Sequence, residues 1–242
     1  MALALLPACT AADEVDRRAG DPVTAAEAET LARLLHRNFE RGGADFVVTA
    51  PYSDAAMLTL TGEIDFRRAV GRAQAVTSFS NGRVDDTRTL FFDDEHIWLG
   101  DVPGLSESLA GAGVPGATYL RRPLSTAGES PLLVDVVVDI LLNLSARTDD
   151  DAQAFRGGGY TWEGQRSIDS RLTSLFALKD GRTVAVGASD DLLAQFVTPL
   201  PGGTYEITVT LSDHGPRRLD VPAEEETADA ADHVELAAAF GV

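Results

Sequence analysis

The residues best suited to acid–base or metal chemistry are scattered along this chain. Its four histidines are His36, His96, His214 and His233. None forms an HxH or HxxxH pair of the kind that chelates a metal ion. Acidic residues stand beside an imidazole at 93–96 and 213–214, which would suit a general base or a weak cation site. Both stretches fall at expected turns, where aspartate is favoured for local reasons, so we interpret them as turn formers and expect no metal site.

Motifs for nucleophilic or phosphate chemistry are also missing from the sequence. No GxSxG nucleophile elbow occurs. The run Gly157-Gly158-Gly159 lacks both the GxGxxG and the GxxxxGK[ST] spacing, so it indicates a flexible loop better than a phosphate cradle. We therefore predict a protein without catalytic residues and without a cofactor.

Two further acidic residues, Asp135 and Asp139, lie one helical turn apart within the most apolar stretch, Ser130 to Ala146. They could hold a metal or a polar headgroup, but a narrow seam facing solvent explains them more simply. Rows four residues apart place apolar side chains on the three other sides, and Ser130-Pro131 forms a helix start. The stretch predicts a helix enclosed by apolar surroundings over most of its circumference.

Two other structures compete for this stretch. A transmembrane helix needs roughly 20 residues, which is longer than the segment, and the aspartates interrupt it. A buried strand would fit the valine-rich composition, but the length and the proline-capped start favour a helix.

Composition limits the size of the hydrophobic core and sets the sign of the surface charge. The chain has 242 residues, of which 44% are hydrophobic, enough for one large domain or two small ones. Acidic residues number 38 against 20 basic ones, for a net charge of -18. Because such a surface repels phosphate backbones and anionic membranes, we expect no binding to nucleic acid.

The single cysteine, Cys9, follows the leucine-rich start MALALLPAC. This start resembles a bacterial lipobox, and the resemblance implies cleavage before Cys9 and attachment of lipid to its sulfur. The alternative is a frayed terminus with an accidental free thiol. Residues 10–22 are charged and without apolar periodicity, which predicts a solvated linker.

Patterning predicts one amphipathic helix and a series of strands. Thr24 and Glu27 make a capping box, and Gly42-Gly43 ends the helix that it starts. The stretch 57–66 alternates between apolar and polar residues, and 204–212 repeats this pattern. Further strands are expected at 45–52, 69–79, 87–93, 96–100, 160–178 with a break near Gly164, 183–187 and 192–197.

Around eight strands that are apolar on one face, with two helices to cover that face, predict an α+β fold. We expect a strongly curved antiparallel β-sheet, a half-barrel, wrapped around covering helices. The expected segments are a residual signal peptide at 1–9, a linker at 10–22, the half-barrel domain at 23–216 and an acidic tail at 217–242. We expect the tail to be a solvated extension with a short helix.

In order and pattern these segments resemble the actinobacterial lipid-carrier lipoproteins of the LppX and LprG type, which are similar in fold to LolA and LolB. The resemblance runs from the lipobox-like start to the late strand TYEITVTLSDHG. It implies that the concave face binds acyl chains of a lipid or glycolipid in the cell envelope, outside the cytoplasm, with the protein anchored to the membrane through Cys9.

The expected cavity wall consists of inward apolar residues of the early strands and of the enclosed helix. It comprises Leu58, Leu60, Ile64, Phe66, Leu90, Phe92, Ile97, Leu99, Val137, Leu141 and Leu144. The alternative is that these residues pack on one another as a dry core. Trp98 and Trp162 are either residues at the mouth of the pocket or ordinary sheet residues.

Two functions from different classes follow. The first is a membrane-tethered, non-enzymatic carrier of acylated lipid. The second is a regulator of envelope signalling that binds a protein partner in the envelope through its acidic surface and tail. An envelope hydrolase ranks third because the sequence has no nucleophile or metal motif.

Overall fold

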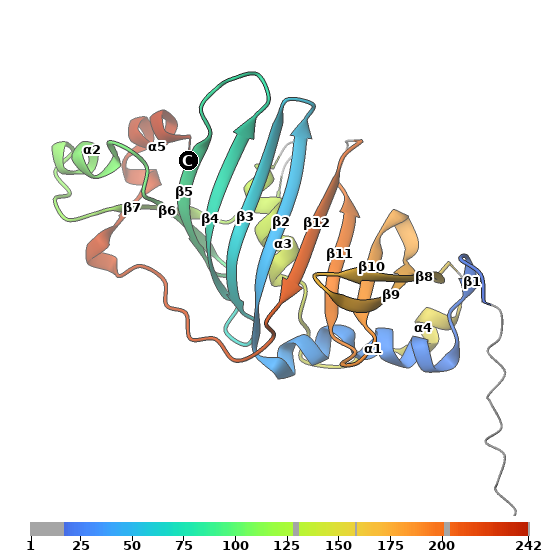
Figure 1. The fold of residues 1–242 in the computed structure, drawn as a ribbon. Helices are drawn as coiled ribbons and strands as arrows, with labels where there is room; N and C mark the ends of the chain where they lie inside the picture. Colours follow the sequence, from blue (N-terminus) through green and yellow to red (C-terminus); the bar gives the residue numbers. More distant parts are fainter. Residues whose placement is uncertain (1–16, 128–130, 158, 201–203, 242) are drawn as a thin grey trace, which may run out of the picture.

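The computed structural model describes residues 17–127, 131–157, 159–200 and 204–241. Its main element is one curved, unclosed sheet of 13 strands (Figure 1). The strand order is β1-β8-β9-β10-β11-β12-β2-β3-β4-β5-β6-β7-β13. Neighbouring strands are antiparallel except for β13 and β7, which are parallel. The expected curved antiparallel sheet is confirmed, with more strands than the sequence predicted; that it wraps around covering helices stays a prediction.

Two meanders joined side by side build the sheet. The first contains β2 (Gly43–Ser53), β3 (Ala56–Asp65), β4 (Val70–Phe79), β5 (Asp86–Phe92), β6 (His96–Gly100) and β7 (Tyr119–Pro123). The second contains β8 (Thr161–Ile168), β9 (Arg171–Ala177), β10 (Thr183–Gly187), β11 (Leu193–Pro199) and β12 (Glu206–Ser212). They join where β12 pairs with β2, so the last long strand lies beside the first.

Helix α1 (Ala25–Arg41) has the start and end that the sequence predicts. Thr24 Oγ1 accepts a hydrogen bond from the Glu27 N–H at 3.3 Å, and Glu27 Oε2 accepts one from the Thr24 N–H at 2.8 Å. Gly42 ends the helix with a φ of 98°, a conformation that glycine adopts without steric cost. The helix runs along one end of the sheet, near α4 (Ala152–Arg156) (Figure 1).

Helix α3 (Leu133–Leu142) lies against the sheet beside β2 and β12 (Figure 1). It is shorter than predicted and begins after Leu132, which makes no side-chain cap hydrogen bond; the expected cap, Ser130, lies outside the described residues. Val137, Val138 and Leu141 are fully buried, but five apolar residues of the helix are only partly buried. These five residues also pack against the apolar core, so the helix has apolar contacts on more than one side, although the side away from the sheet is partly open.

The turns explain most of the acidic pairs in the sequence. Asp93 Oδ1 accepts hydrogen bonds from the backbone N–H groups of Glu95 and His96, at 2.8 and 2.7 Å, and so closes the β5–β6 turn.

In the stretch 160–178 the chain reverses at Asp169-Ser170, both with positive φ, while Gly164 marks a bulge. The predicted break near Gly164 is a bulge, not the end of the strand.

The last 26 residues are not a solvated extension where the structure describes them. β13 (Thr227–Asp229) pairs with β7, and α5 (Val234–Phe240) packs near α2 (Leu105–Gly111). Here Ala228, Ala230 and Ala237 are buried with Leu105, Leu109, Ala117 and Leu120 in a second apolar core. Small alanines fit between the layers, and the acidic residues remain outside, which explains why the tail is charged and still folded.

The N-terminal side of the chain also joins the sheet. β1 (Asp21–Pro22) pairs with Trp162 and Thr161 of β8, so the end of the expected linker is part of the fold. Cys9 and residues 10–16 lie outside the described residues, and the expected lipid attachment at Cys9 stays a prediction. Within the described ranges, we find no helix that is both long and apolar enough to cross a membrane.

Candidate functional site: an apolar cavity between helices and sheet

The eleven residues predicted to form a cavity wall do come together. All of them belong to one continuous apolar core, and each is between 0 and 7% exposed. Leu60, Ile64, Leu90, Phe92 and Ile97 have no exposure. Seven of the eleven pack within this core and line neither of the two spaces described below.

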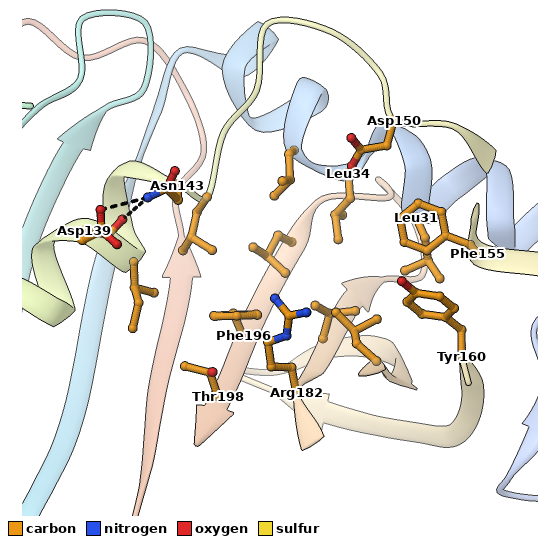
Figure 2. Close-up of a pocket in the computed structure, with 16 residues that line it drawn as sticks. Leu31, Leu34, Asp139, Asn143, Asp150, Phe155, Tyr160, Arg182, Phe196 and Thr198 are labelled. Atoms are coloured by element: carbon orange, nitrogen blue, oxygen red, sulfur yellow. Dashed lines mark hydrogen bonds between the residues drawn. The ribbon is translucent and has the colours of Figure 1, made fainter. Parts of the chain in front are cut away.

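An apolar cavity lies at the other half of the sheet, between the helices and the second meander. It has a volume of about 440 Å³, within the range of about 300–1,000 Å³ that small-molecule sites occupy. Strands β10 and β11 form its floor, α1 and the last turn of α3 form its sides, and the α4 segment and the start of β8 close it (Figure 2). We call this space the main cavity.

Aliphatic and aromatic side chains make up most of the lining. Figure 2 shows Leu31 and Leu34 of α1 across from Phe196 of β11, with Phe155 and Tyr160 side by side. The two aromatic rings are 5.0 Å apart between centroids and stabilise this corner. The remaining apolar lining residues are Leu35, Ile140, Leu144, Leu178, Val184 and Leu193.

The polar groups of the main cavity are few and lie on different elements. Asp139 and Asn143 come from α3, where the Asn143 amide donates to an Asp139 carboxylate oxygen at 3.2 Å. Asp150 follows in the next loop, and Thr198 lies on β11. Arg182, at the start of β10, points into the space between the apolar side chains (Figure 2). An apolar chamber with polar groups at its margins fits a molecule with a long apolar part.

A second, smaller hollow of about 270 Å³ lies beside the first turn of α3. Leu58, Leu90 and Leu99 from the predicted wall line it, together with Leu132 and other residues. Of the eleven predicted residues, one more, Leu144, lines the main cavity. Helix α3 therefore stands between the two spaces, with its start at the smaller hollow and its end at the main cavity.

Asp135 is not part of a solvent-facing seam, which corrects the sequence-based interpretation. Its side chain is 2% exposed, and both of its oxygens accept hydrogen bonds from the Arg122 guanidinium, at 2.9 and 2.6 Å. The backbone N–H of Ser125 donates a third bond at 3.2 Å. This bidentate pair connects α3 to β7. It explains how a carboxylate can be buried in the most apolar helix of the chain.

The other residues that the sequence offered for acid–base chemistry, metal binding or a pocket mouth do not form a site together. Desolvation lowers the pKa of His214 to about 4, and the nearby charge of Arg171 lowers it further, so the ring is neutral at physiological pH. Trp98 is 3% exposed, and Trp162 packs against the core under the Arg17 guanidinium, 4.7 Å from its ring centroid. Neither tryptophan lines either space. Among the described residues, no group of three or more metal-ligating side chains is found.

The sequence contained part of the signal for the main cavity. The apolar face of α1 was predicted to pack on another element, and the strands at 183–187 and 192–197 were predicted, but their inward residues were not assigned to a site. Leu193 and Val184 are buried and line the space together with Leu31 and Leu34. Period-two alternation in these short strands could have identified them.

Similar proteins are found among solved structures but not among family models or curated proteins. No family model matches the chain, and no curated protein matches it. Among solved structures, the crystal structure of LprF from Mycobacterium bovis is similar, with a TM-score of 0.47 and 13% sequence identity, over 84% of this chain and 99% of that one. A similarity this distant does not assign a function. Support for a function has to come from the residues of this chain.

Proposed function

We propose that this chain is a non-enzymatic lipid-binding protein that holds an acyl chain in the main cavity. The observation that carries the proposal is the apolar chamber of about 440 Å³ between β10, β11, α1 and α3. Moving one methylene from water into such a chamber is worth roughly 0.8 kcal/mol before ordering costs, so the chamber can offset the cost of taking a long chain out of the apolar core of a membrane.

The proposal places the protein in the cell envelope, outside the cytoplasm and attached to the membrane through a lipidated Cys9. The lipobox-like start of the sequence supports this location. In this arrangement the tether keeps the cavity close to a supply of lipid or glycolipid. The proposed site differs from the sequence-based one: Leu144 remains a candidate contact in the main cavity, whereas Leu58, Leu90 and Leu99 line the smaller hollow. The other predicted residues belong to the apolar core.

Native mass spectrometry with lipid extraction tests the proposal on the full chain purified from an actinobacterial host. We expect a near-stoichiometric adduct of lipid mass. Ile140→Trp should remove most of it, because this partly buried residue lines the main cavity and a larger ring occupies the space. Val84→Trp, at a position that is 85% exposed, is the matched control and should retain the adduct.

Two results would count against the proposal. One is a clean apoprotein mass for a folded wild-type protein. The other is equal lipid content in the Ile140→Trp and Val84→Trp variants, which would place the lipid elsewhere on the molecule.

A further inference from the structure

We infer that the main cavity selects amphiphiles with an anionic headgroup, which Lys179 and Arg182 bind at the tip of the β9–β10 hairpin. The inference rests on the proposed function and adds the class of headgroup to it. Lys179 is the only lysine in this chain, whose net charge is -18. It lies three residues before Arg182, which lines the main cavity.

The hairpin tip holds these two cations in place at the apolar lining. The backbone N–H of Leu178 donates to the Arg182 carbonyl oxygen at 2.7 Å, which closes the turn that contains the 3-10 segment η1 (Lys179–Gly181). Leu178 and Arg182 both line the main cavity. Lys179 Nζ lies 5.1 Å from the centroid of the Tyr160 ring, which lines the same space. One turn therefore brings both positive groups to the edge of the chamber.

Arg182 is only loosely neutralised by the protein. Its nearest carboxylate, Asp180, is 3.7 Å away and 86% exposed on the same turn. By contrast, Arg122 and Arg171 hold their partners at 2.6 and 2.8 Å. In the part of the chain that the structure describes, Lys179 forms no ion pair. Arg182 Nε donates a long hydrogen bond to the Lys179 carbonyl oxygen, at 3.4 Å, so the terminal N–H groups of Arg182 and the Lys179 ammonium are the groups that bind a phosphate or carboxylate.

The acidic groups of the cavity lie on other elements and orient the ligand. Asp139 is on α3 and already accepts a hydrogen bond from Asn143, and Asp150 is in the loop that follows α3. A negative headgroup is repelled at that side and attracted at the hairpin. The net charge of the whole molecule opposes an anion only weakly at this site, because salt screens charges beyond about 8 Å at physiological ionic strength.

Calorimetric titration of the delipidated full chain tests the inference with ligands that share one apolar chain. The ligands are dodecyl phosphate, dodecanol and dodecyltrimethylammonium, with inorganic phosphate as the free anion. We expect dodecyl phosphate to bind about tenfold more tightly than dodecanol, the difference that one charge-assisted contact provides. Inorganic phosphate should not bind at the same concentrations.

Variants then locate the effect. Lys179→Gln combined with Arg182→Gln should lower the affinity for dodecyl phosphate about tenfold and so remove most of its advantage over dodecanol. Arg182→Lys alone should keep a preference for the phosphate. The matched control is Arg83→Gln, which removes one positive charge from the β4–β5 connection, where Arg83 lies over the Phe79 ring. Thermal melting verifies that each variant is folded.

Each contrary outcome has a distinct meaning. Equal binding of dodecyl phosphate and dodecanol, tighter binding of the ammonium ligand, or binding of inorganic phosphate alone would overturn the inference while a lipid cavity remains. Failure of every chain-bearing ligand to bind would overturn the proposed function itself.

Discussion

At the scale of single residues, the buried ion pair between Arg122 and Asp135 holds α3 against β7. The two side chains are 11% and 2% exposed. Removing one partner leaves the other charge buried and unpaired, which costs about 3–5 kcal/mol. Asp135→Ala should therefore lower the free energy of unfolding by this amount in urea denaturation.

The control for this prediction is a surface pair on neighbouring strands. Arg72 and Glu63 are 58% and 23% exposed, so Arg72→Ala should cost no more than about 1 kcal/mol. Replacing both Arg122 and Asp135 by leucine should restore part of the lost stability, since no lone charge remains. Equal effects of Asp135→Ala and Arg72→Ala would show that α3 does not depend on the buried pair.

His214 gives the fold a predictable response to acid. Desolvation lowers its pKa from the ordinary 6.5 to about 4, so the folded state keeps a neutral ring while the unfolded state takes up a proton. Its contribution to stability is complete above pH 6.5 and is lost as the pH falls towards about 4. After discounting for the partial exposure of the ring, we expect the free energy of unfolding to fall by about 1–2 kcal/mol over this pH range.

Unfolding of the wild type and of His214→Asn, measured at pH 7 and pH 5, isolates this contribution. The wild type should lose more stability between the two values than the variant does. Identical pH dependence in the two proteins would contradict the burial of the His214 ring.

At the scale of elements, the C-terminal segment is an integral layer. The Thr118 N–H donates to the Glu226 carbonyl oxygen at 2.8 Å, and Arg121 Nε donates to Asp229 Oδ1 at 2.8 Å. The hydrogen bonds of Arg121 to Asp229, followed by those to Glu224, raise the pKa of this guanidinium, so it stays charged. The carbonyl of Phe240 in turn accepts from Arg88 at 2.6 Å. The acidic tail is therefore held by arginines of the first meander.

Leu109→Ala tests this layer. Leu109, on α2, is fully buried against the C-terminal elements. Its truncation to alanine should lower the free energy of unfolding by about 2–5 kcal/mol. Hydrogen exchange should become faster in β13 and α5 than in β3. The control, Leu172→Ala, is 56% exposed and should change stability by less than about 0.5 kcal/mol. Unchanged exchange in α5 would contradict the packed layer.

The alternation of residues predicted the strands better than it predicted the cavity. In β3, Leu58, Leu60 and Ile64 are buried as expected, because side chains on a strand alternate between the two faces. Whether an inward residue contacts a neighbour or an empty space depends on how α1 and α3 pack across the sheet. That packing joins segments far apart in the chain, and no local pattern encodes it.

At the scale of the whole molecule, the unclosed sheet separates two tasks. The early strands enclose a tight core around Phe92, whose ring centroid lies 6.4 Å from that of Phe46. The later strands, under α1 and the end of α3, leave the main cavity open. The curved, unclosed sheet agrees with the predicted half-barrel, and our proposal moves the lipid site from the first meander to the second.

Paramagnetic NMR with a doxyl-labelled fatty acid shows directly whether an acyl chain occupies the main cavity. We expect strong broadening of the methyl signals of Leu31, Ile140 and Leu193, and much weaker broadening at Leu60 and Ile64. Broadening centred on Leu60 and Ile64, or none at any buried methyl group, would contradict the proposed function.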